Sequence, residues 1–246
     1  MDFDDAKKLE EDKKWIKAAE KYKNFALNNP ENPNASEAFF RAARIYAEKY
    51  NLCQKSKPLL ERLLRNYPDF KQRKEAERMI FFCPDYFPIS IKRKWVYGDS
   101  QTLGKNMKQI VKVKACTPGK AIVEVKFYAG RKFIQKNEKK YIWDISYIKE
   151  KSTGTDFIVL KYPIRKKDRW KGRQNKNTVY FEVVKTGLSV KVAAGVFEGC
   201  VKIKQKIPGM TSWLYVYYAP WVGKILTATA GMKFENRVEE LLSYAR

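Results

Sequence analysis

The stretch FFCPDYFPIS, residues 81–90, separates two parts of the chain that have different patterns. Its prolines, Pro84 and Pro88, interrupt helical periodicity, because proline lacks the backbone N–H that a helix interior needs. Before this stretch, apolar residues recur at helical spacing; after it, they alternate with polar residues as in β-strands. The sequence therefore predicts a two-domain α+β protein, with a helical domain over residues 1–88 and a β domain over residues 94–246.

The positive charge is concentrated after this junction. The 246 residues carry 51 Lys and Arg against 27 Asp and Glu, a net charge of +24. Residues 1–88 contain 18 basic and 15 acidic residues, whereas residues 89–246 contain 33 and 12. Such a cationic β domain attracts anionic surfaces. Lysine outnumbers arginine, and proteins that recognise specific base sequences rely on arginine. The charge therefore favours a generic anionic surface over a specific nucleic acid as partner.

Residues 1–88 contain repeated helical patterns. Trp15, Ala18, Tyr22 and Phe25 recur at helical spacing and predict an amphipathic helix that ends before Asn29. The segments NNPENPNASEAFFRAARI (28–45) and NYPDFKQRKEAERMI (66–80) align with a shift of 38 residues, against about 34 in tetratricopeptide repeats. We interpret this part as a short tetratricopeptide-like array that binds a protein or peptide or acts as a spacer. It resembles the arrays of bacterial outer-membrane assembly and cell-division-coordinating lipoproteins.

The second part alternates in period two, for example at Val123, Val125 and Phe127, with short turns such as STGT (152–155) between the segments. This pattern predicts an antiparallel sheet, either a sandwich or a strongly curved half-barrel. Lysines follow the same period in IVKVKAC (110–116) and CVKIKQKI (200–207). We expect these lysines to share one face and to contact the anionic surface; they are Lys112, Lys114, Lys202, Lys204 and Lys206.

Three ordered segments of the β domain carry a second resemblance: IVLKYPIRKKDRW (158–170), VKVAAGVFEGCVKIKQ (190–205) and VYYAPWVGKIL (216–226). They resemble a family of bacterial extracytoplasmic lipoprotein domains that has an antiparallel β fold and no established activity. The resemblance implies structural roles for Pro163, Trp170, Ala194, Gly195, Phe197, Cys200, Tyr217, Tyr218, Ala219, Pro220, Val222 and Gly223. Two glycines of the family pattern are replaced, by Lys167 and Trp221, so a turn that needs positive φ there is built differently.

The cluster YYAPWVGK, residues 217–224, is compatible with an aromatic binding platform, a membrane-seeking loop or a corner between strands. Flanking strand patterns favour the corner, with aromatic rings packed across it. We expect Trp221 to be exposed beside Lys224, where it would stack on a ligand or lie at a membrane interface. Residues 233–246 fit a helix by their apolar spacing, whereas the family resemblance favours a closing strand.

Histidine is absent and the four cysteines form no CxxC pair. These facts argue against Ser–His–Asp catalysis, metal sites and cofactors, and we expect no enzyme activity. Cys53 and Cys83 fall at adjacent ends of two consecutive antiparallel helices, which allows a disulfide. The alternative is a pair of buried, reduced thiols.

These patterns together predict a non-enzymatic bacterial cell-envelope protein that acts as a protein-interaction or anionic-surface-binding module. It would lie in the periplasm or at the outer membrane if a leader preceded Met1, and in the cytoplasm if Met1 is the native start. Two alternatives stay open. One is a cytosolic nucleic-acid-binding protein that uses the cationic β domain. The other is a carrier whose curved sheet encloses a lipid-like ligand.

Overall fold

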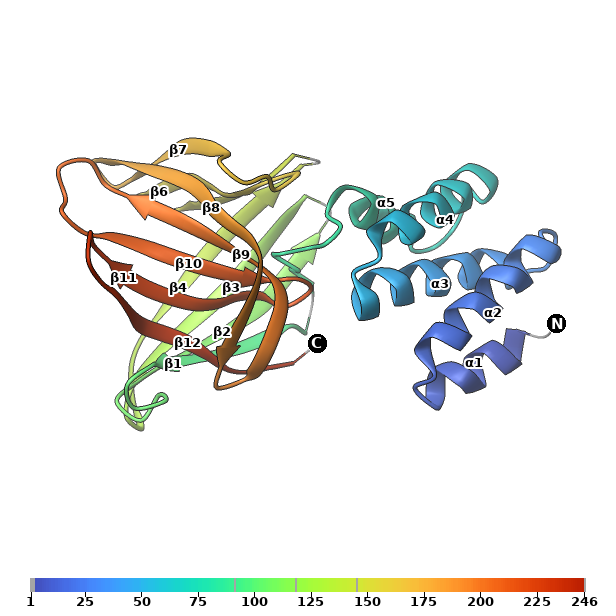
Figure 1. The fold of residues 1–246 in the computed structure, drawn as a ribbon, viewed down its shortest axis with the longest axis horizontal. Coiled ribbons are helices and arrows are strands. Elements are labelled where there is room, and N and C mark those ends of the chain that lie inside the picture. Colours follow the sequence, from blue (N-terminus) through green and yellow to red (C-terminus); the bar gives the residue numbers. More distant parts are fainter. Residues whose placement is uncertain (1–2, 91, 118, 145, 246) are drawn as a thin grey trace. The chain divides into compact units, whose positions relative to one another are not determined.

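Figure 1 shows the computed structural model, which describes residues 3–90, 92–117, 119–144 and 146–245. Backbone contacts divide the chain into two compact units, Met1–Asp85 and Tyr86–Arg246, which we call the helical unit and the barrel unit. The domain limits inferred from the sequence, residues 1–88 and 94–246, stay a prediction. Within the described residues, no helix is both long and apolar enough to cross a membrane.

The described part of the helical unit has five helices, each packed against the next. They are α1 (Phe3–Glu11), α2 (Trp15–Asn28), α3 (Ala35–Tyr50), α4 (Cys53–Asn66) and α5 (Arg73–Phe81). Fully buried alanines in α2 and α3, among them Ala18 and Ala42, leave room for the helices to approach closely. Glu10 of α1 accepts hydrogen bonds from Tyr22 Oη (2.9 Å) and Arg41 Nη1 (2.8 Å), which joins the first three helices.

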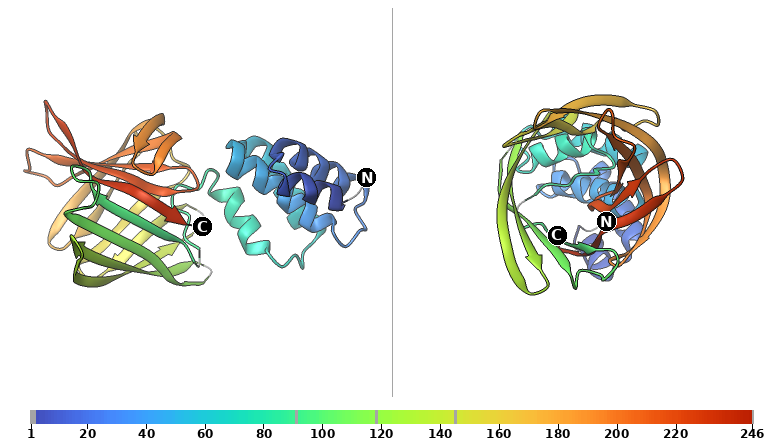
Figure 2. Two further views of the ribbon diagram at one scale, coloured as in Figure 1. Left: turned by 90° about the horizontal axis from the view of Figure 1, so that it is seen from below. Right: turned by 90° about the vertical axis from the view of Figure 1, so that its left-hand side faces the viewer.

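Twelve antiparallel strands form a closed barrel in the described part of the barrel unit (Figures 1 and 2). They are β1 (Lys94–Asp99), β2 (Met107–Thr117), β3 (Lys120–Ala129), β4 (Lys132–Trp143), β5 (Tyr147–Ser152), β6 (Thr155–Lys161), β7 (Arg169–Gln174), β8 (Asn177–Val192), β9 (Gly195–Lys206), β10 (Trp213–Ala219), β11 (Gly223–Ala230) and β12 (Glu235–Ala245). Each strand pairs with its neighbours in sequence, and β1 pairs with β12 to close the ring.

The predicted fold class is wrong. The sheet is neither a half-barrel nor a sandwich, because Lys94 of β1 lies opposite Ala245 of β12 and the edges meet. The described helices are five short elements beside a dominant barrel, and they do not establish a tetratricopeptide array. Helical periodicity and small residues at helix crossings occur wherever antiparallel helices pack, so the spacing of Pro30 and Pro68 does not specify that repeat.

The C-terminal segment is a strand rather than a helix. Residues Glu235–Ala245 form β12 and pair with both β11 and β1. A register shift between Val96 and Tyr97 accommodates a bulge at this closure. Because it pairs on both sides, β12 completes the wall that encloses the barrel interior. Elsewhere in the ring, pairing is shortest between β6 and β7, where Thr155 and Asp156 of β6 are the two paired residues.

Candidate ligand-binding cavity in the barrel

The barrel encloses a cavity of about 360 Å³. Its wall consists of inward-facing residues that alternate along the strands, such as Val111, Val123, Val159 and Val216. Neighbouring residues in the same strands face outward, so Ile110 lies on the outer surface next to Val111. The sequence indicated this alternation and left open a curved sheet that encloses a ligand, but it did not predict a closed ring of strands.

One end of the cavity is closed by the segment that precedes β1. The Phe87 ring lies 5.0 Å from the Tyr141 ring and 6.4 Å from the Tyr218 ring, measured between centroids. Tyr86 fixes this segment, since its N–H donates to Tyr162 Oη (2.9 Å) and its hydroxyl donates to the Gly199 carbonyl (2.8 Å). We call this end the closed end.

The corner at residues 217–224 forms part of the closed end. Strand β10 ends at Ala219 and β11 begins at Gly223, as the corner interpretation predicts. Trp95 Nε1 donates to the Val222 carbonyl (2.7 Å), and Arg93 Nη1 donates to the Trp221 carbonyl (3.0 Å). The expectation that Trp221 is exposed is wrong, because its side chain is 5% exposed. The residues before β1 cover the corner, so Trp221 offers no surface to a ligand or membrane.

Two polar clusters lie on the cavity wall. In the first, Glu150 accepts from Lys139 Nζ (3.1 Å) and from the Tyr141 hydroxyl (3.0 Å). Burial, reinforced by the Glu150 carboxylate, raises the pKa of Tyr141 well above its usual value. This tyrosine therefore stays protonated at any physiological pH and serves as a hydrogen-bond donor.

In the second cluster, Glu239 accepts from Gln109 Nε2 (2.6 Å) and pairs with the Lys224 ammonium. The Lys224 Nζ atom lies 4.4 Å from the centroid of the Tyr97 ring. Lys224 thus points into the barrel, and the expectation that it contacts an outside surface is wrong. A register shift between Tyr217 and Tyr218 places Lys224 opposite Tyr218, which lines the cavity.

The five outer lysines do not form one face. Lys112 and Lys114 lie on β2, whereas Lys202, Lys204 and Lys206 lie on β9, and five ladder steps separate these strands in the ring. The β9 lysines stack on aromatic rings of β10: Lys202 Nζ lies 3.8 Å from the Tyr215 centroid and Lys204 Nζ lies 3.8 Å from the Trp213 centroid. The single basic face inferred from the sequence is therefore wrong, since closure separates its two halves.

The family-like residues lie mainly in packing positions. The Trp170 ring stacks on Phe181 at 5.5 Å, and its Nε1 donates to the Ile158 carbonyl (2.7 Å). Tyr217 and Tyr218 point to opposite sides of β10: the first bonds Glu235 on the outside and the second faces the cavity. Of the other positions, Gly223 lines the cavity. The rest do not; they are Pro163, Gly195, Phe197, Cys200 and Pro220.

Both positions where a family glycine is replaced keep a left-handed backbone. Lys167 has φ of +72° and Trp221 has φ of +62°. Glycine adopts such angles without steric cost, whereas other residues do not. Both turns therefore keep the positive φ that glycine would adopt, although Lys167 and Trp221 carry side chains.

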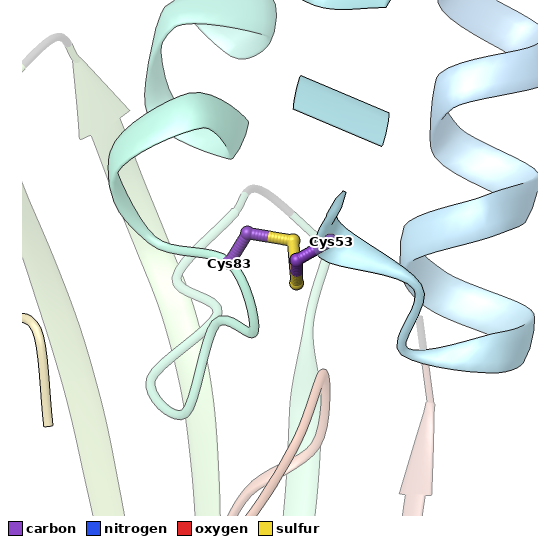
Figure 3. The surroundings of a disulfide bond; sticks show 2 residues. All are labelled: Cys53 and Cys83. Carbon is purple, nitrogen blue, oxygen red and sulfur yellow. A yellow bond between two sulfur atoms is a disulfide. The ribbon is translucent and has the colours of Figure 1, made fainter. Parts of the chain in front are cut away.

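In the helical unit, Cys53 and Cys83 form a disulfide, and their Cα atoms are 5.7 Å apart (Figure 3). Cys53 begins α4, and Cys83 follows the end of α5 by two residues. In the part of the chain that the structure describes, no group of three or more Cys, Asp or Glu side chains is arranged to hold a metal ion.

Sequence reasoning missed most residues of the cavity wall. Phe87, Tyr97, Tyr141, Glu150 and Glu239 were not singled out, although Trp95 and Tyr97 in KWVYGD (94–99) alternate as inward-facing residues do. The available signal was this alternation of large aromatic residues in a strand. It identifies which residues face one side, but only closure makes that side the interior.

No protein-family model matches this chain. No curated protein matches it either. Among solved structures, it is similar to a Bacteroides fragilis protein described as exported and as having a YmcC-like fold, with 15% identity and a TM-score of 0.49 over 67% of this chain and 100% of that one. A Parabacteroides distasonis protein described as a lipoprotein gives 15% identity and a TM-score of 0.44, over 65% of this chain and 98% of that one. A hypothetical protein from Chlamydia trachomatis gives 9% identity and a TM-score of 0.33, over 64% and 88%.

Proposed function

We propose that this chain is a non-enzymatic protein of the bacterial cell envelope whose barrel binds a small, largely apolar ligand of the lipid type. The observation that carries the proposal is the cavity of about 360 Å³ inside the closed barrel. This volume falls within the range of about 300–1,000 Å³ that is usual for small-molecule sites. Phe87 lies across one end, so a ligand would occupy a pocket with apolar and polar walls rather than a channel through the barrel.

The charges of the wall define the kind of ligand. Each polar cluster contains one cation and one anion, Lys139 with Glu150 and Lys224 with Glu239. An anionic ligand that paired with Lys139 would leave the Glu150 carboxylate, whose side chain is 9% exposed, without its partner, which is costly away from water. An apolar body with neutral hydrogen-bonding groups leaves both pairs intact. Such a ligand fits this wall best.

The disulfide supports a location in the envelope. Structural disulfides persist in oxidising compartments, such as the bacterial periplasm, and are rare in the cytosol. The Cys53–Cys83 bond joins positions 30 residues apart in the helical unit. Together with the resemblance of residues 158–226 to extracytoplasmic domains, this favours export over a cytosolic nucleic-acid role.

Binding of the neutral apolar dye N-phenyl-1-naphthylamine tests the proposal. The dye should fluoresce in the purified, delipidated protein, and Val111→Trp, which fills the cavity, should abolish the signal. Ile110→Trp is the matched control, because it adds the same ring on the outer face of the same strand. Circular dichroism of both variants establishes that the barrel is folded. Equal loss in the two variants, or no dye binding by the unsubstituted protein, would refute the cavity as a ligand site.

A further inference from the structure

The end of the barrel opposite the closed end exposes a cluster of large apolar side chains. In this barrel the turns that follow odd-numbered strands all lie at one end, which is the left side of the barrel in Figure 1. Four of these turns, together with the first residues of the strands that follow them, carry large apolar residues that are between 48% and 93% exposed. They are Leu103 and Met107 after β1, Phe133 and Ile134 after β3, Met210 after β9, and Met232 and Phe234 after β11.

These four turns are consecutive around the ring. Because β1 pairs with β12, the β1–β2 turn lies between the β3–β4 turn and the β11–β12 turn, and the β9–β10 turn comes next. A hydrogen bond from the Gly130 N–H to the Asn106 carbonyl (2.7 Å) joins two of them. The remaining turns at this end, Thr153–Gly154 and Asn175–Lys176, are polar. The apolar residues thus occupy one arc, which we call the turn rim.

Basic residues accompany the apolar ones. The rim segments 100–108, 130–134, 207–212 and 231–234 contain five basic residues and no acidic residue: Lys105, Lys108, Arg131, Lys132 and Lys233. The nearest acids are Asp99, which accepts hydrogen bonds from the backbone N–H groups of Thr102 and Met107 within the rim, and Glu235, which pairs with Lys202. Exposed apolar side chains ringed by cations match the chemistry of an anionic bilayer surface.

The cavity reaches this same end. Gln174, the last residue of β7, and Leu214, the second residue of β10, both line it. At the other end Phe87 and Pro88 line it and close it. The turn rim and the polar β7–β8 turn therefore both lie at the end of the barrel that Gln174 and Leu214 of the cavity wall reach.

We propose that the turn rim docks the barrel on an anionic lipid bilayer, with its apolar side chains in the interface and its basic residues against lipid phosphates. This goes beyond the binding of a ligand in the cavity and does not depend on it. A net charge of +24 would attract the whole protein to anionic vesicles in any orientation. The test must therefore distinguish the rim from the rest of the cationic surface.

Two matched pairs of variants make that distinction in a sedimentation assay with vesicles of phosphatidylcholine, with and without 30% phosphatidylglycerol. Arg131→Glu/Lys132→Glu reverses two adjacent rim charges, and Arg165→Glu/Lys166→Glu reverses an adjacent Arg–Lys pair at the opposite end. Met232→Ser removes a rim side chain that is 93% exposed, and Val196→Ser removes one at the opposite end that is 59% exposed. All six substituted positions are in turns or within the first two residues of a strand, so folding should survive.

We expect at least a tenfold preference for anionic vesicles, a loss of about tenfold for Arg131→Glu/Lys132→Glu, and a several-fold loss for Met232→Ser. The two opposite-end variants should bind within twofold of the unsubstituted protein. Equal losses in both charge-reversal variants would show attraction without a preferred face and overturn the proposal. An unchanged Met232→Ser would overturn the apolar insertion. Dye uptake by the cavity should be normal in all four, which separates this result from a failure of the proposed function.

Discussion

Replacement of Lys167 by glycine should stabilise the barrel, because this residue has φ of +72°. The left-handed region costs a residue with a Cβ atom about 1–2 kcal/mol, and glycine avoids that cost. Glycine also has more freedom in the unfolded chain, which offsets about 0.4–1 kcal/mol of the gain. The Lys167 side chain is exposed and its N–H, which donates to the Val183 carbonyl (2.8 Å), is retained by glycine. The net expectation is a gain of about 0.5–1 kcal/mol in the free energy of unfolding.

Urea unfolding followed by tryptophan fluorescence measures this gain, with Lys166→Gly as the matched control. Lys166 is also exposed and is not among the residues with positive φ. Its replacement should therefore cost about 0.4–1 kcal/mol through the unfolded state. The two neighbouring substitutions have opposite predicted signs. If Lys167→Gly is no more stable than Lys166→Gly, the backbone strain inferred at this turn is absent.

Three further predictions concern Trp221, the disulfide and the Cys200 thiol. Trp221→Gly relieves a similar backbone angle but removes a buried ring, so calorimetry should show a net loss of about 2–4 kcal/mol. Cys53→Ser should cost the helical unit about 3–4 kcal/mol under oxidising conditions, since the bond closes a 30-residue loop, and an unchanged urea midpoint would contradict this. Burial, with a contribution from Glu198, raises the pKa of the Cys200 thiol to about 12. At pH 8 about one Cys200 thiol in 10⁴ is then ionised, so iodoacetamide should label Cys200 only after unfolding. Half-buried Cys116 is the reference for labelling of the folded protein.

Features that depend on neighbouring residues could be predicted from the sequence. The corner at residues 217–224 follows from two strand patterns on either side of Pro220 and Gly223, and the structure has β10 and β11 there. The approach of Cys53 and Cys83 depends only on two consecutive antiparallel helices. In both cases the relevant chain segments are adjacent, so local periodicity constrains their geometry.

Closure of the barrel could not be predicted in this way. It rests on the pairing of β1 with β12, which come from opposite ends of the barrel unit. No local pattern distinguishes two strands that pair with each other from two open edges of a curved sheet. The errors on Trp221 and Lys224 have the same origin. Trp95 reaches the corner from 127 residues earlier in the chain, and a register shift turns Lys224 inward.

Closure also changes what the aromatic corner does. As an exposed loop, YYAPWVGK would itself be a binding surface, whereas in the barrel it supports the closed end through Tyr218 and the carbonyl of Val222. Under the proposed function, this corner would close one end of the cavity, and a ligand would then enter and leave at the end that carries the turn rim. The apolar and basic residues of that rim then lie where an apolar ligand would otherwise pass through water. A carrier that loads from a lipid surface needs this arrangement, because an apolar ligand that crosses open water loses the favourable free energy of its burial.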